Sequence, residues 1–162
     1  MNSPALPRDP LFQRSWWAKR LEGLQGATDA PELVPRPDLS TPARLVEELR
    51  LRTHDGEPLF ALLARPRGVP EPVPTRIRCC GPADPPELDA AAAREGVAEI
   101  VVQEVAGRRL EDRVLDMVST FRVARSALGL DARRVAAPTP RPGQDLPDEL
   151  RIAQQLSDWN FC

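Results

Sequence analysis

His54 is the single histidine of the chain and the first side chain that could perform acid–base chemistry. An imidazole serves as a general base when a serine or cysteine nucleophile lies within hydrogen-bond reach. His54 directly precedes the dipeptide Asp55-Gly56, which is typical of a tight turn, and no nucleophile is recognisable close to it. We therefore expect a turn histidine at the surface; a catalytic base is the alternative.

The three cysteines raise the question of redox chemistry or metal binding. Cys79 and Cys80 are adjacent, so in a strand their side chains would point to opposite faces, which suits neither a redox pair nor a shared metal. We expect both to be buried or half-buried small hydrophobic side chains. Cys162 permits no assignment. The low, odd cysteine count fits a reducing compartment and predicts a cytoplasmic protein.

A group of charged side chains follows the most apolar stretch of the chain. Glu111, Asp112 and Asp116 could form an acidic site, but they fall in the first turns of a predicted helix, where negative charge suits the helix dipole. We therefore favour a structural role for these carboxylates. Arg108 and Arg109 follow a predicted strand, at the edge where α/β proteins usually bind ligands, and are the better candidates for binding.

Two adjacent indoles, Trp16 and Trp17, could stack on a sugar ring. An aromatic pair near a short amphipathic helix more often docks that helix onto its own domain or onto a neighbouring subunit, because aromatic side chains bury a large apolar area. We favour docking and keep sugar binding as the alternative.

Sequence motifs for other common chemistries are absent. The chain contains neither G-x-x-x-x-G-K-[ST] nor G-x-G-x-x-G, which would indicate a nucleotide site, and neither C-x-x-C nor H-E-x-x-H, which would indicate a metal site. Carboxylate pairs are as frequent as in any charged protein, and none stands out. The sequence therefore predicts no catalytic residue set, no cofactor site and no metal site.

Length and composition place the chain among ordinary globular domains. It has 162 residues, of which 41% are hydrophobic and 28% charged, and a net charge of −2. This balance gives no electrostatic support for nucleic-acid or anionic-membrane partners. No apolar run approaches the roughly 20 residues that a membrane span needs. The opening MNSPALPRDPLF does not have the pattern of a signal peptide.

The elements that would position these residues fall into two regions. Residues 1–44 are predicted to form an arm, with an amphipathic helix over 10–24 and then a proline-rich extended segment. Residues 45–162 are predicted to form the domain. It opens with two strands around the Asp55-Gly56 turn, the strongest hairpin signal in the chain.

Strands and helices alternate in the rest of the domain, which predicts an α/β fold with a parallel sheet and right-handed crossovers. In the helix with the clearest apolar stripe, Arg113, Asp116 and Arg122 are predicted to lie off that stripe. The predicted elements are a strand over 75–81, a helix over 85–96, a strand over 97–105, a helix over 110–129, a strand over 133–138 and a helix over 148–159.

Four stretches of the sequence carry a resemblance to a known family. They are FQRSWWAKRLEGL (12–24), EELRLRTHDGEPLFALLARPRG (47–68), REGVAEIVVQEVAGR (94–108) and RVLDMVSTFRVARSALGLDARRVA (113–136). Their order and spacing are similar to the N-terminal half of the acetyl xylan esterase / cephalosporin-C deacetylase family. The resemblance implies a partial α/β-hydrolase fold: an opening antiparallel hairpin, then parallel strands with covering helices, in three layers. It also implies the family's substrate class, acetylated sugars and related carboxylic esters.

The catalytic positions of that family are where this sequence departs from it. The family's nucleophile is the serine of G-x-S-x-G, and this motif occurs nowhere in the chain; ungapped placement puts Arg141 at that position. Ungapped placement also puts Pro82 where a backbone N–H would form part of the oxyanion hole, and proline has no N–H. Counterparts of the family's acid and histidine do not appear before Cys162.

Three hypotheses follow from the resemblance and its gaps. The first is a truncated, catalytically inactive esterase-like domain that is either marginally stable or associated with a partner, most simply another copy of itself. The second is an N-terminal half that completes a hydrolase in trans with another hydrolase chain. The third is an unrelated small α/β binding or interaction protein, which a structure without an antiparallel hairpin beside a parallel sheet would favour.

Overall fold

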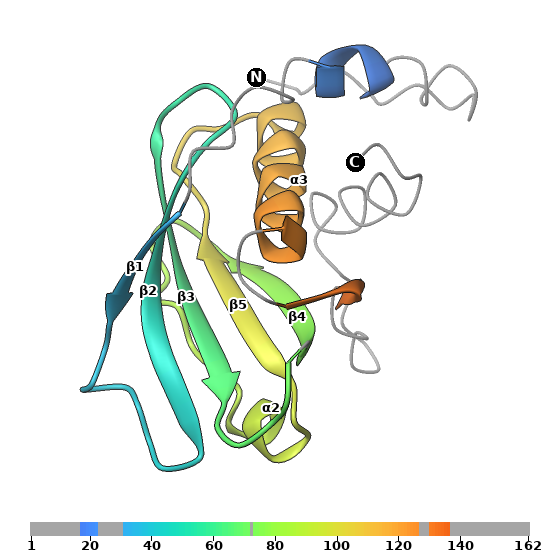
Figure 1. The fold of residues 1–162 in the computed structure, drawn as a ribbon. Helices are drawn as coiled ribbons and strands as arrows, with labels where there is room; N and C mark the ends of the chain where they lie inside the picture. Colours follow the sequence, from blue (N-terminus) through green and yellow to red (C-terminus); the bar gives the residue numbers. More distant parts are fainter. Residues whose placement is uncertain (1–16, 23–30, 72, 127–129, 137–162) are drawn as a thin grey trace, which may run out of the picture.

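A computed structural model describes residues 17–22, 31–71, 73–126 and 130–136. The strands of these ranges form one six-stranded sheet, in the order β1-β2-β3-β5-β4-β6 (Figure 1). The predicted 148–159 helix, together with Arg141 and Cys162, lies outside the described residues. The strands are β1 (Glu32–Pro35), β2 (Arg44–Arg52), β3 (Pro58–Pro66), β4 (Val73–Cys80), β5 (Ala98–Gln103) and β6 (Leu130–Ala136).

The sheet is mixed, as the predicted hairpin followed by alternating elements requires. β1 pairs with β2, β2 with β3 and β3 with β5, all antiparallel. β4 lies between β5 and β6 and is parallel to both. The predicted antiparallel hairpin beside a parallel sheet is therefore confirmed. A structure without this hairpin would have favoured an unrelated α/β protein.

β1 was not predicted, because the segment around it looked too proline-rich for a helix or an inner strand. Prolines 31 and 35 stand at its two ends, and among the described strands it pairs with β2 alone, with Leu33 opposite Leu49. An edge strand tolerates proline where an inner strand does not, because its outer N–H groups need no ladder partner. The segment is extended, as predicted, but it belongs to the sheet.

The β2–β3 turn is built as the Asp-Gly signal predicts. The Gly56 N–H donates to the Thr53 carbonyl (3.1 Å), and the Thr53 N–H donates to the Glu57 carbonyl (2.7 Å). Gly56 has φ of +93°, a region that other residues adopt only with strain. This turn fixes the register of the hairpin, in which Leu49 pairs with Ala61.

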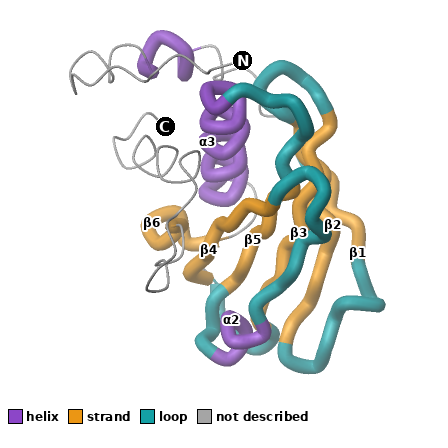
Figure 2. Tube along the Cα trace, turned by 180° about the vertical axis from the view of Figure 1, so that it is seen from behind, coloured by secondary structure: helices purple, strands orange, loops and turns teal. Residues whose placement is uncertain are grey.

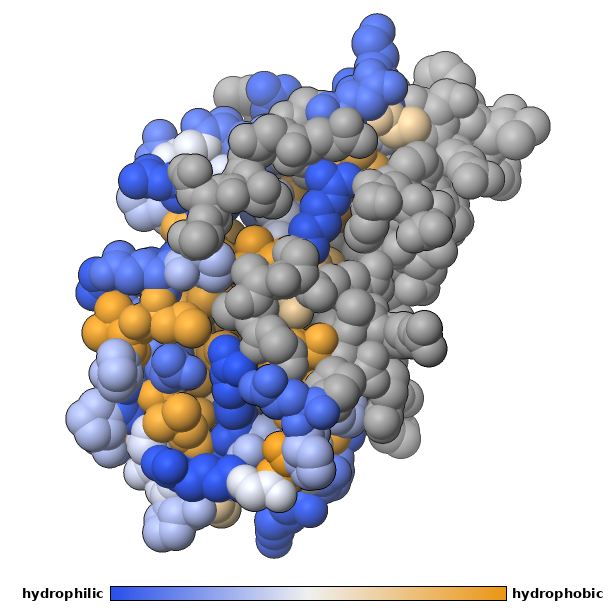
Figure 3. Space-filling model, in the orientation of Figure 1, coloured by the Kyte–Doolittle hydropathy of each residue, from blue (hydrophilic) through white to orange (hydrophobic). Residues whose placement is uncertain are grey.

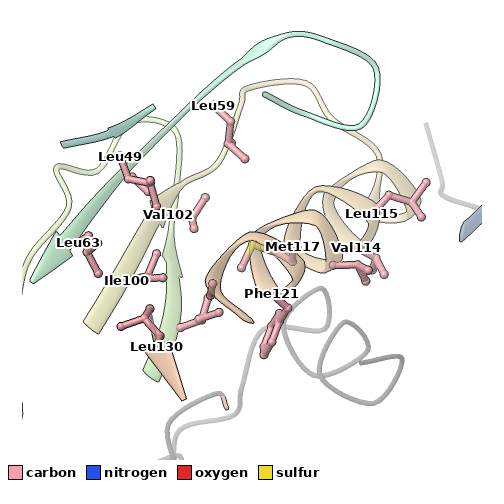
Figure 4. Packing of buried hydrophobic residues seen from close by; sticks show 14 of the residues in the cluster. Leu49, Leu59, Leu63, Ile100, Val102, Val114, Leu115, Met117, Phe121 and Leu130 are labelled. Atoms are coloured by element: carbon pink, nitrogen blue, oxygen red, sulfur yellow. The ribbon is translucent and has the colours of Figure 1, made fainter. Parts of the chain in front are cut away.

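Helix α3 (Leu110–Ser126) covers one face of the sheet. Its apolar stripe packs onto side chains from β2, β3 and β5, and Phe121 is a fully buried member of this main core (Figure 4). Trp17 and Leu21, four residues apart in a helical segment over 17–22, belong to the same core. Among the described residues, no helix is long and apolar enough to cross a membrane.

The second face of the sheet is covered by residues 81–89 and by α2 (Ala90–Arg94). The Gln103 amide donates to the carbonyls of Pro82 and Asp84, at 3.3 and 2.9 Å. At the other end of this loop, the Asp89 N–H donates to Glu99 (2.8 Å). The described chain therefore has three layers. The sheet lies between α3 on one face and the loop 81–89 with α2 on the other (Figure 2).

The predicted first residues of one helix and of one strand are wrong. Asp89 caps α2 by accepting the Ala91 N–H at 2.9 Å, so the helix begins there and not at the prolines near residue 85. The residues before the cap are needed as the loop over the second face. β6 begins at Leu130, three residues before the predicted strand, because Leu130 is buried in the main core. The predicted helix over 10–24 is described only at 17–22.

Phe121 gives a direct test of this packing. Phe121→Ala is expected to lower the free energy of unfolding by about 3–5 kcal/mol, because it removes a fully buried ring and leaves a cavity. Phe60, whose side chain is half-buried on the second face, provides the matched control. Phe60→Ala is expected to lower the free energy of unfolding by clearly less. Urea unfolding of both variants measures the difference; equal losses would contradict the assignment of the main core.

Candidate functional site

Three of the charged residues singled out by the sequence, Arg108, Asp112 and Asp116, lie together at one edge of the sheet. The β2–β3 turn lies at the edge where β4 and β5 end, because β2 and β3 are antiparallel and β3 is antiparallel to β5. The loop after β5 leads to α3 at the same edge (Figure 1). This is the carboxyl edge of the parallel strands, where ligands bind in open α/β sheets.

Arg108 and Asp116 form the centre of the cluster. The Arg108 Nη2 donates to both Asp116 oxygens, at 2.9 and 3.0 Å, and its Nε donates to Oδ2 at 3.2 Å. The exposed fractions of the two side chains are 10% and 6%. Arg108, one of the two arginines considered as candidates for ligand binding, is thus occupied by a carboxylate of its own chain.

Asp55 provides a second carboxylate for the same guanidinium. Arg108 Nη1 donates to Asp55 Oδ2 at 2.7 Å, and the Thr53 hydroxyl donates to the other oxygen. The Arg108 guanidinium and then the Thr53 hydroxyl hold the pKa of Asp55 well below its usual range. The guanidinium therefore connects the β2–β3 turn to α3.

Burial and hydrogen bonding have opposite effects on the pKa values of Asp116 and Arg108. Burial raises the pKa of Asp116, against the opposing hydrogen bonds from Arg108 and the His54 N–H. Burial alone would lower the pKa of Arg108, but the hydrogen bonds to Asp55 and Asp116 outweigh it and raise that pKa. Arg108 is therefore held as a cation.

His54 differs from its prediction as a surface turn histidine. Its ring Nε2 lies 2.9 Å from Asp112 Oδ1, and its backbone N–H donates to Asp116 Oδ1 at 3.1 Å. The side chain is 20% exposed. It stands at the turn as expected, yet it is half-buried and oriented by a carboxylate. The ring bonds to no serine or cysteine of the described residues.

Asp116 is the residue whose burial was not predicted from the sequence. It was expected to lie off the apolar stripe of the helix, and it is nevertheless buried in the structure. The available signal was its position between apolar neighbours on both sides, in VLDMV. A carboxylate in such a run needs a cationic partner when the helix packs, and Arg108 lies eight residues earlier.

The other charged candidates have separate roles. Glu111 pairs with Arg20 and so joins the segment over 17–22 to the start of α3. Arg109 is exposed and has no part in the cluster. The structural role predicted for the carboxylates Glu111, Asp112 and Asp116 agrees with these contacts.

The predictions for the cysteines and the tryptophans agree with the structure where it describes them. Cys79 and Cys80 are both half-buried. Cys79 packs against the main core, whereas Cys80 lies near the Asp84 carbonyl at 3.7 Å. Burial, and then the nearby Asp84, raises the pKa of the Cys80 thiol, which disfavours the reactive thiolate. Trp17 is buried in its own domain; Trp16 lies outside the described residues.

Cation binding is one chemistry that the cluster could offer. Ligand atoms of His54, Asp55 and Asp116 all lie within 4.8 Å of one another. Arg108, however, already bonds to both carboxylates, so a metal ion would have to displace a buried guanidinium. The arrangement fits an internal ion-pair network.

A small pocket beside the cluster shares Asp116 with it and has room for little more than a water molecule. It is lined by Leu59, Val102, Glu104, Val105, Arg113, Asp116 and Met117.

Comparison with solved structures defines the class of fold. The chain resembles an acetyl xylan esterase from Paenibacillus sp. R4 with 14% identity and a TM-score of 0.60, over 84% of this chain and 53% of that one. It resembles acetyl xylan esterase 1 from Thermoanaerobacterium sp. JW/SL YS485 with 14% identity and a TM-score of 0.61, over 80% and 51%. These proteins are α/β-hydrolases, and the described residues have part of that fold.

The comparisons also set the limits of the likeness. The chain spans about half the length of these esterases. No protein-family model matches the sequence. No curated protein matches it either.

Removing Asp116 tests the central ion pair. Asp116→Ala is expected to cost about 3–5 kcal/mol of unfolding free energy, because a buried guanidinium loses its principal partner. Arg108→Ala with Asp116→Ala should cost less than the sum of the two single variants, because the double variant leaves no buried charge unpaired. Urea unfolding gives all three values. Asp38→Ala, in an exposed pair with Arg36, is the control and should stay near wild type; strict additivity at the buried pair would contradict the coupling.

The depressed pKa of Asp55 predicts a pH dependence. A carboxylate whose folded-state pKa lies below its ordinary value of 3.8 stabilises the fold above that value and loses this contribution as the pH falls. Asp116, whose pKa is raised, acts in the opposite sense, so a comparison specific to Asp55 is needed. The stability difference between wild type and Asp55→Asn should shrink between about pH 5 and pH 3. Urea midpoints across that range measure it; a constant or growing difference would rule out the ion pair as its source.

Proposed function

We propose that the 162 residues form an acetyl xylan esterase-like domain of the α/β-hydrolase superfamily that does not hydrolyse esters by itself. The observation that carries this proposal is the position of the single histidine. His54 sits at the β2–β3 turn with its ring bonded to Asp112. A serine esterase needs its base within hydrogen-bond reach of the nucleophile.

The hydroxyl groups of two serines support the same conclusion. Ser40 Oγ donates to the Arg36 carbonyl at 2.9 Å, and Ser119 Oγ donates to the Leu115 carbonyl at 3.1 Å. Both hydroxyls stabilise local backbone, and neither bonds to the imidazole. The sequence itself contains no G-x-S-x-G, the motif that exposes a nucleophilic serine at a strained turn.

The loop after β4 adds a second argument. In an α/β-hydrolase a backbone N–H from this region helps to bind the oxyanion of the reaction intermediate. Here the position matched by the resemblance is Pro82, which has no N–H, and the Pro82 carbonyl accepts a hydrogen bond from Gln103. The Asp84 N–H donates to the Gly81 carbonyl at 3.1 Å, so that donor serves the turn.

An esterase assay tests the proposal. The purified chain is expected to show no turnover of p-nitrophenyl acetate above the buffer rate and no labelling by a serine-reactive fluorophosphonate. An active acetyl esterase measured in parallel is the positive control. Turnover with labelling would overturn the proposal, and Ser119→Ala, Ser126→Ala and Ser157→Ala would then identify the nucleophile. Turnover that His54→Gln abolishes would restore His54 as a base.

Completion of a hydrolase in trans is the second candidate. In this proposal a second chain adds its strands to those described here and supplies the catalytic residues. Among the described strands, β6 ends the sheet order and pairs with β4 alone. Such a partner would have to carry G-x-S-x-G, the acid and the histidine.

Association with another copy of the chain is the simplest form of partnership. Leu33 and Leu51 are partly exposed at the rim of the main core. On the face shown in Figure 3, apolar side chains reach the surface between charged ones. Burial of such patches between two copies would stabilise both.

Two measurements distinguish self-association from completion of a hydrolase in trans. Sedimentation velocity of the purified chain should show mass increasing with concentration in the micromolar range if copies associate; a stable monomer throughout would exclude self-association. Affinity purification from the source cell should recover a chain with the missing catalytic motifs if completion in trans is correct. Recovery of no such chain would rule that candidate out.

A further inference from the structure

We draw no further inference here: the strongest candidate, the side-chain cluster of His54, Asp55 and Asp116 between the β2–β3 turn and α3, has ligand atoms close enough for a metal ion but carries nothing, because Arg108 already bonds to both carboxylates and no independent observation points to a bound ion.

Discussion

The double-sided burial of β5 is the constraint on which the rest of the structure depends. Its first five residues are buried, and it lies between β3 and β4 in the sheet. A strand that is apolar on both faces must be covered on both, so α3 packs on one face and the loop with α2 packs on the other. The exception, Glu99, shows how strong this constraint is: its buried carboxylate accepts from Arg78 at 2.7 Å and from the Asp89 N–H, and so holds the covering loop in place.

Elements with a clear local sequence pattern could be predicted. The hairpin follows from an Asp-Gly turn and an imperfect alternation, β5 from a run of β-branched residues, and α3 from a helical stripe. β1 could not be predicted, because its prolines are acceptable only at an edge, and the position of a strand in the sheet is a tertiary property. The start of α2 could not be predicted for a related reason. The residues leading to its cap at Asp89 are held by hydrogen bonds with side chains of β4 and β5, which are distant in the sequence.

The candidate site shows the same division between local and distant information. Helix position indicated a structural role for Glu111, Asp112 and Asp116. It could not reveal that Asp116 is buried against Arg108, or that His54, 58 residues earlier in the chain, bonds to Asp112. The cluster lies at the edge where α/β proteins carry ligand sites, but its charges are satisfied by one another. Position in the fold is therefore a weaker guide to chemistry here than the partners of each group.

The short length of β1 affects how readily other protein molecules can associate with this edge of the sheet. An open sheet edge is a template on which another chain can add a strand and begin aggregation. This edge offers four residues, bounded by Pro31 and Pro35, with Glu32 and Arg50 forming an ion pair across the outermost strands. Proline and charge at an outer strand are the devices by which natural sheets discourage such growth. Pro31 and Pro35, because of which this strand was not predicted, thus also protect the same edge from the addition of further strands.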